Sequence, residues 1–279
     1  KVRRYAGPKA SLPEKLVELS PGVWLTSGRM AVIEGKNALA VIDPGDEPFS
    51  APEGPLDGLR EVMSKTGKPL AEVWVTHSHP DHIANLPEIK ALFNGLIKVV
   101  AHENSPVNPD AVMPGDEFLV DCLATPGHSA ANDDLAFYLP AAQTLFSGDI
   151  VQPKGERWER AFYPSPWPFF TDGDTYLSSL DKLLALDFDI LVTGHREVRF
   201  EDEARRWVEV TRRAIFEVAN RANEKRAQGA PLNEAARNIF LELCSERGIT
   251  KDIALKRFDG TPSSFDLYDL PGVEYYYGN

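Results

Sequence analysis

The sequence contains little cysteine, no long apolar run and no extended basic patch. Its two cysteines, Cys122 and Cys244, lie far apart, which fits a reducing compartment or core packing better than a disulfide framework and excludes a zinc site built from cysteines. No segment approaches the ~20 consecutive apolar residues that a membrane-spanning helix needs. No charged and then apolar signal sequence follows Lys1, so we expect a cytoplasmic protein, with a leader removed before Lys1 as the open alternative.

Acidic residues outnumber basic residues. The 42 Asp and Glu against 30 Lys and Arg give a formal net charge of −12, so the chain as a whole repels polyanions such as nucleic acid. The basic cluster from Lys1 to Arg4 is short and terminal, which is typical of a solvated chain end. We therefore predict a small-molecule substrate and no nucleic-acid or membrane partner, and leave a homodimer open.

Hydrophobic patterning predicts an α+β protein. At 279 residues the chain is long enough to bury a large core. Short β-rich runs predict strands at residues 22–27, 38–43, 73–77, 98–101, 118–125, 135–139, 144–147 and 190–193. Helical patterns predict helices at residues 56–65, 83–93, 175–186 with Asp174 as its N-cap, 203–228 and 232–247. We predict a sheet sandwich with outer helices over residues 1–200 and a helical extension over residues 201–279 that packs on it.

The segment 151–173 has an unusual composition. Prolines alternate there with aromatic residues, namely Trp158, Phe162, Tyr163, Trp167, Phe169 and Phe170. A long segment without regular structure is often functional. It fits a substrate-pocket wall as well as it fits a structural plug beneath the carboxy-terminal helices or a dimer contact.

Half of the six histidines fall within one short run. His77, His79 and His82, together with Asp81, directly follow a predicted strand and precede a predicted helix. Alternation along the strand end sends His77 and His79 to the same side, while the turn lets Asp81 and His82 reach a second point. Imidazole nitrogen and carboxylate oxygen are ligands that zinc, iron and manganese accept.

Three further candidate ligands each follow a predicted strand and stand directly after a glycine. They are His128, Asp149 and His195. A preceding glycine lets the backbone turn sharply. The strand ends therefore predict a metal centre built from distant parts of the chain.

In this order, the His-x-His-x-Asp-His run, Gly-His128, Ser-Gly-Asp149 and Gly-His195 resemble the metallo-β-lactamase-fold superfamily of hydrolases, in particular its glyoxalase II and lactonase-like members. The resemblance covers about residues 22–195, and the ordered set is far more specific than a lone His-x-His. It implies a four-layer αββα sandwich with the metals at one edge of the two sheets. It further implies one metal on His77, His79 and His128, a second on Asp81, His82 and His195, and Asp149 between them.

The resemblance also implies a mechanism. Two divalent cations ~3.5–4 Å apart, zinc with iron or manganese as alternatives, can activate a water whose pKa falls towards about 7. We expect Asp81 to be catalytic, by orienting that water or relaying its proton. Asp43 is either a hydrogen-bond acceptor for a ligand imidazole or a turn residue.

We therefore predict a metal-dependent hydrolase of a small ester, lactone or thioester. The metal ligands alone do not choose among the substrates of the superfamily, and β-lactamase activity or an iron-dependent persulfide dioxygenase are the alternatives. The negative charge counts against RNA processing. Arg157, Arg160 and Arg196 are candidate partners for the carboxylates of glutathione. A binding protein without turnover would be expected to lack ligands, and all seven are present.

Overall fold

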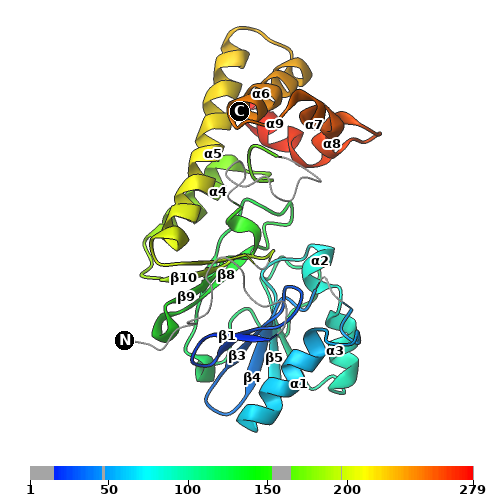
Figure 1. Ribbon diagram of the computed structural model, residues 1–279, viewed down its shortest axis with the longest axis vertical. Helices are drawn as coiled ribbons and strands as arrows, with labels where there is room; N and C mark the ends of the chain where they lie inside the picture. The colour runs from blue at the N-terminus through cyan, green and yellow to red at the C-terminus, as the bar shows by residue number, and fades with distance from the viewer. Residues whose placement is uncertain (1–15, 46–47, 153–164, 196, 279) are drawn as a thin grey trace. The chain divides into compact units, whose positions relative to one another are not determined.

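The computed structural model describes residues 16–45, 48–152, 165–195 and 197–278 (Figure 1). The chain divides into two compact units. The first comprises Lys1–Thr125, Ala131–Asp149 and Asp187–Ala204, and the second comprises Pro126–Ala130, Ile150–Leu186 and Arg205–Asn279. The predicted boundary between two domains at residue 200, and the packing of the helical extension on the core, stay predictions.

The first unit contains two β-sheets. The six-stranded sheet runs in the order β1 (Val17–Ser20), β2 (Val23–Leu25), β3 (Ala31–Glu34), β4 (Leu39–Ile42), β5 (Leu70–Trp74) and β6 (Lys98–Val100). Its first four strands are antiparallel, and β5 and β6 run parallel to β4. The five-stranded sheet runs in the order β11 (Val198–Phe200), β10 (Ile190–Val192), β9 (Thr144–Phe146), β8 (Leu135–Leu139) and β7 (Asp121–Ala124). Only its β9–β10 pair is parallel among the described pairings.

A buried apolar core joins the two sheets. Ile33 and Trp74 from the first sheet share this core with Phe137 from the second, and the Trp74 and Phe137 rings lie 5.3 Å apart. Because side chains alternate along a strand, Val32 points to the other face. There it packs in a second buried cluster with residues of α1 (Pro55–Thr66) and α3 (Leu86–Leu92). The first unit is thus layered as helices, sheet and sheet (Figure 1).

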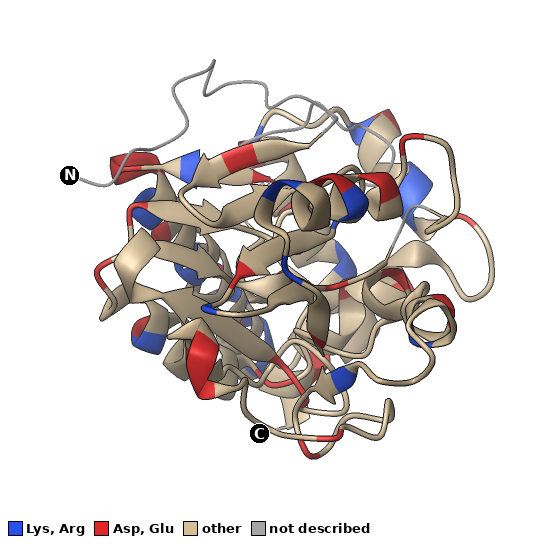
Figure 2. Ribbon diagram, turned by 90° about the horizontal axis from the view of Figure 1, so that it is seen from below, with Lys and Arg blue, Asp and Glu red and all other residues tan. Residues whose placement is uncertain are grey.

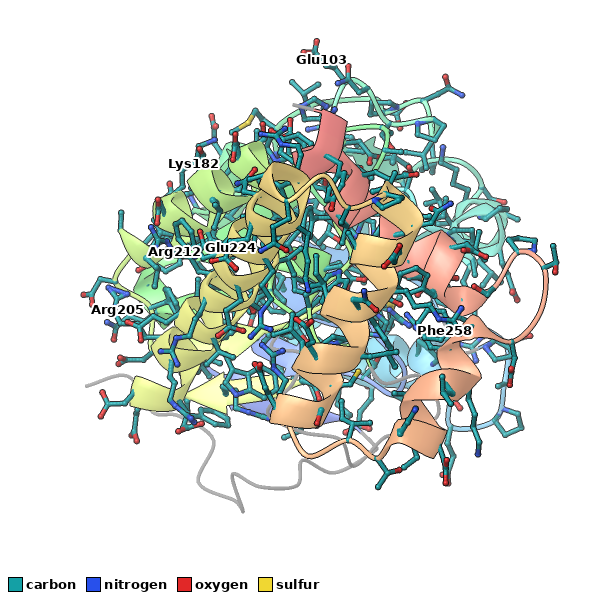
Figure 3. All side chains as sticks on the ribbon, turned by 90° about the horizontal axis from the view of Figure 1, so that it is seen from above. Glu103, Lys182, Arg205, Arg212, Glu224 and Phe258 are labelled. Atoms are coloured by element: carbon teal, nitrogen blue, oxygen red, sulfur yellow. The ribbon has the colours of Figure 1, made fainter. Side chains whose placement is uncertain are left out.

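The second unit is mainly helical. It contains α4 (Gly173–Leu184), most of α5 (Asp202–Ala227), α6 (Leu232–Glu246), α7 (Lys251–Leu255), α8 (Ser264–Tyr268) and α9 (Leu270–Gly278). The α5 side chains Arg205 and Arg212 bind α4, through the Leu184 carbonyl at 2.7 Å and the Asp181 carboxylate at 2.7 Å (Figure 3). A buried ion pair between Arg257 and Asp269 at 2.6 Å lies deeper in this unit.

The aromatic segment 151–173 is described only in part, and Trp158, Phe162 and Tyr163 lie outside the described residues. Trp167 and Phe170 are fully buried. The Trp167 ring meets Phe240 of α6 edge-on at 5.7 Å, and Phe170 packs beside Tyr176 and Tyr276. Of the two roles considered for this segment, these two residues therefore have the structural one, because they form part of the core of the second unit.

The predicted α+β class with a helical carboxy-terminal region is confirmed, and each predicted strand overlaps β2 or one of β4 to β10. Three strands, β1, β3 and β11, were not predicted. In place of the single helix expected at residues 83–93, the chain forms two helices, α2 (Pro80–Ile83) and α3 (Leu86–Leu92). The predicted N-cap Asp174 is wrong. Asp172 caps α4 instead, because its extended backbone lets its side chain accept the Thr175 N–H at 2.9 Å.

No helix in the described ranges is both long enough and apolar enough to cross a membrane.

Candidate metal centre

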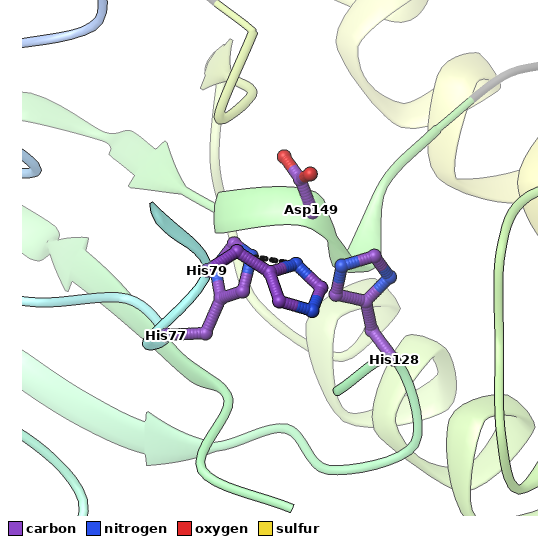
Figure 4. A group of neighbouring side chains, drawn as sticks. All are labelled: His77, His79, His128 and Asp149. Carbon is purple, nitrogen blue, oxygen red and sulfur yellow. Dashed lines mark hydrogen bonds between the residues drawn. The ribbon is translucent and has the colours of Figure 1, made fainter. Parts of the chain in front are cut away.

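The His77–His82 run leaves the end of β5 and enters α2. Pro80 stands in the first turn of α2 and His79 is its N-cap residue in an extended conformation, because proline fixes a φ that suits a helix start. His77 and His79 thus remain on the strand exit, with His77 Nε2 2.9 Å from His79 Nδ1 (Figure 4). Asp81 and His82 follow on the helical turn, and the His82 ring centroid lies 4.0 Å from that of His77.

Asp149 and His195 stand at the ends of β9 and β10, which are parallel neighbours in the second sheet. Asp149 Oδ2 lies 3.0 Å from His195 Nε2, and Asp149 Oδ1 lies 3.5 Å from His82 Nε2. The glycine before each ligand is required by space. A Cβ on Gly148, whose φ is +52°, would lie 2.8 Å from the Thr76 side chain, and a Cβ on Gly194 would overlap the Asp149 carboxylate.

Within the first unit the candidate ligands form two groups. The first metal group contains His77, His79 and Asp149, and the second metal group contains Asp81, His82 and His195. In each group one ligand atom per residue lies within 4.8 Å of the others. Imidazole and carboxylate donors gathered at this spacing suit zinc, manganese or iron.

His128 belongs to the second unit, in the loop Pro126–Ala130. Its side chain is buried, and its Nδ1 lies 3.0 Å from the carbonyl oxygen of Phe169. Because a carbonyl can only accept, His128 donates from Nδ1 and keeps the lone pair on Nε2. Its membership of the first metal group stays a prediction.

Asp43 has the role of a hydrogen-bond acceptor. Its Oδ2 lies 2.8 Å from His82 Nδ1 and accepts the Thr76 hydroxyl at 2.6 Å, while its Oδ1 accepts the Thr76 N–H at 2.8 Å. A carboxylate behind a histidine fixes its tautomer and leaves Nε2 for a metal. Asp43 also forms a turn, because its carbonyl accepts the Gly45 N–H at 2.8 Å. Both alternatives for Asp43 therefore hold.

The buried carboxylates create a strongly negative environment. Burial acts to lower the pKa of His82, but the charges of Asp149 and Asp43 outweigh it and raise that pKa to about 10. Burial acts to raise the pKa of Asp149, but the neighbouring His195 and His82 hold it well below its usual value. An environment that favours positive charge this strongly also favours a bound cation. The donor set and its charge thus fit divalent metal ions.

The segment of the chain from β2 to His195 identifies the protein family. The model described as the metallo-beta-lactamase superfamily matches residues 24–122 and 100–195. The chain belongs to the metallo-beta-lactamase superfamily.

Several curated relatives in this superfamily are named hydroxyacylglutathione hydrolase. The protein from Ruegeria pomeroyi is 29% identical over 206 residues, covering 71% of this chain and 72% of the relative. The protein from Brucella anthropi is 32% identical over 145 residues, covering 49% and 52%. The protein from Rhodopseudomonas palustris is 27% identical over 230 residues, covering 77% and 82%. The chain thus spans from about half to about four fifths of the length of these relatives.

Solved structures share the metallo-beta-lactamase fold. A stereoselective inverting sec-alkylsulfatase from Pseudomonas sp. aligns with a TM-score of 0.60 at 18% identity, covering 80% of this chain and 45% of that chain. A metallo-beta-lactamase from Pontibacter korlensis aligns with a TM-score of 0.52 at 15% identity, covering 72% and 97%. At these identities the likeness shows the fold alone.

Sequence reasoning missed Arg29, whose side chain contacts the second metal group. Arg29 Nη2 lies 2.9 Å from Asp81 Oδ2, and Arg29 Nη1 lies 3.1 Å from His82 Nε2. A signal was present, because Arg29 follows β2 and stands directly after Gly28, whose φ is +65°. Glycine and then a polar residue after a strand is the same pattern that identified His128, Asp149 and His195.

Proposed function

We propose that this chain is a metal-dependent hydrolase that cleaves a small thioester, ester or lactone. Its centre would hold two metal ions, with zinc as the first candidate. The observation that carries the proposal is the pair of candidate ligand groups at the strand ends, with Asp149 of the first group 3.0 Å from His195 and 3.5 Å from His82 of the second. When bound there, a divalent ion lowers the pKa of its water to about 7 and polarises the substrate carbonyl.

The residues of the chain orient this chemistry. Asp43 holds His82 with Nε2 directed away from the carboxylate, and the Phe169 carbonyl holds His128 in the corresponding tautomer. We propose that His128 supplies the third histidine of the first metal group. The Asp81 side chain is 42% exposed, which suits our proposal that it orients the attacking water.

Among the substrate classes, a thioester is favoured. The relatives from Ruegeria pomeroyi, Brucella anthropi and Rhodopseudomonas palustris are all named hydroxyacylglutathione hydrolase. A hydroxyacylglutathione thioester is therefore the first substrate to test. The residues proposed to bind glutathione, Arg157, Arg160 and Arg196, lie outside the described residues.

Charge supports a small substrate over a polyanion. The formal net charge is −12, and acidic and basic residues are interspersed along the ribbons (Figure 2). Three points stay predictions: that the protein has no nucleic-acid partner, that it can form a homodimer, and that it is cytoplasmic.

The test is a substrate panel on purified protein that has been stripped of metal and reloaded with zinc, manganese or iron. The panel contains a hydroxyacylglutathione thioester, a lactone, a β-lactam and a phosphodiester. We expect thioester or ester turnover that is lost in His79→Ala and retained in His102→Ala, a matched substitution outside both metal groups.

Two results would contradict the proposal. One is the lack of turnover of every thioester, ester and lactone with all three metals. The other is oxygen consumption on a persulfide by a chain that binds one iron, which would favour the dioxygenase.

A further inference from the structure

Arg29 contacts the second metal group through its guanidinium. Its guanidinium pairs with Asp81 at 2.9 Å, contacts His82 Nε2 at 3.1 Å and donates to the Gly194 carbonyl at 3.4 Å, next to His195. All of these residues belong to the first unit. The Arg29 side chain is only 8% exposed and His82 is fully buried, so water screens the contact with His82 weakly, and the ion pair with the 42% exposed Asp81 more strongly.

These contacts use atoms that a metal would need. A guanidinium carries only N–H donors and stays protonated in proteins. Asp43 faces His82 Nδ1 at 2.8 Å, so Nε2 is the atom through which His82 would bind a metal. The Arg29 guanidinium lies 3.1 Å from that atom. Asp81 Oδ2 is occupied by the same guanidinium.

We propose that Arg29 is a resident cation of the second metal group, which a second metal ion must displace. The first metal group then binds a divalent ion tightly, and the second group binds one more weakly. A permanent charge of +1 placed on the ligand atoms of the second group opposes a divalent ion there by competition and by repulsion. The inference rests on the metal centre of the proposed function and is independent of the bond that is hydrolysed.

The experiment is a calorimetric titration of the metal-free full chain with Zn²⁺, repeated with Co²⁺ and read by visible absorption. We expect the native chain to bind one ion tightly and a second more weakly. In Arg29→Gln the affinity for the second ion should rise between about tenfold and a hundredfold, the equivalent of one charge-assisted hydrogen bond, while the affinity for the first ion stays unchanged.

Two further variants separate charge from structure. Arg29→Lys keeps the charge but loses the two-nitrogen contact, so its affinity for the second ion should fall between those of the native chain and Arg29→Gln. Arg60→Gln removes an arginine from an exposed pair with Asp57 elsewhere in the first unit and should bind ions as the native chain does. Circular dichroism of each variant checks that it is folded.

Equal affinities for two ions in the native chain would overturn the inference. A second-ion affinity that is unchanged or lower in folded Arg29→Gln would also overturn it, because Arg29 would then only position Asp81 and His82. The titration contains no substrate. Unequal binding by a chain that hydrolyses no thioester, ester or lactone would thus refute the proposed function and leave the role of Arg29 intact.

Discussion

Replacing Asp43 by asparagine should weaken both the fold and the second metal group. Asp43 is 2% exposed, and its Oδ2 receives the Thr76 hydroxyl at 2.6 Å and faces His82 Nδ1 at 2.8 Å. In Asp43→Asn the amide oxygen can still accept the Thr76 N–H, but an NH₂ group then replaces Oδ2. This NH₂ group donates, so it favours a His82 that carries its proton on Nε2 instead of Nδ1.

The magnitude follows from these contacts. Two charge-assisted hydrogen bonds at about 1.5–3 kcal/mol each are lost, and rotation of the Thr76 hydroxyl with the change of His82 tautomer restores weaker ones, which leaves a net loss of about 2–4 kcal/mol in the free energy of unfolding. A proton on His82 Nε2 blocks the metal-binding lone pair. Loss of such a supporting carboxylate typically lowers metal affinity by about 10–100-fold, and we expect that loss for the second ion.

Urea unfolding of the metal-free chain measures the stability, and zinc calorimetry measures the affinity. The matched control is Asp110→Asn, since Asp110 also accepts a backbone N–H in the first unit, from Val99 at 2.8 Å. The control should lose no more than about 1.5 kcal/mol and should bind zinc as the native chain does. A second-ion affinity in Asp43→Asn that equals that of the control would refute the reasoning about the tautomer.

The other predictions concern space, a buried charge and the metal itself. Gly194→Ala places a methyl group against the Asp149 carboxylate and the His82 ring, so zinc calorimetry should show at least about tenfold weaker binding at both groups; native affinity would mean that the strand end can shift. Asp269→Ala deprives Arg257, whose side chain is 5% exposed, of its carboxylate, and urea unfolding should show a loss of about 3–5 kcal/mol. A loss below about 1 kcal/mol would show that water reaches Arg257. Zinc at 100 times its dissociation constant should stabilise the native chain by about 2.7 kcal/mol, and an unchanged thermal midpoint would contradict zinc binding to the folded state.

Much of the local structure could be predicted from the sequence. The run at residues 135–139 coincides with β8, whereas the helical structure expected from residue 83 already begins at Pro80, with α2. The α4 cap was misplaced by two residues, because Asp172 and Asp174 are both suitable caps by residue type. Backbone conformation alone distinguishes them, since Asp172 is extended and Asp174 already lies within the helix.

The sequence by itself determined which residues are candidate metal ligands and that they stand at strand ends, because strand alternation and glycine turns act over a few neighbouring residues. Only the tertiary structure decided the distances among these candidates, with Asp149 3.0 Å from His195 and 3.5 Å from His82. It also decided that Asp43 supports His82, 39 positions along the chain, and that Arg29 reaches His82, 53 positions along the chain. Such contacts depend on the pairing and packing of two sheets, which no local pattern specifies.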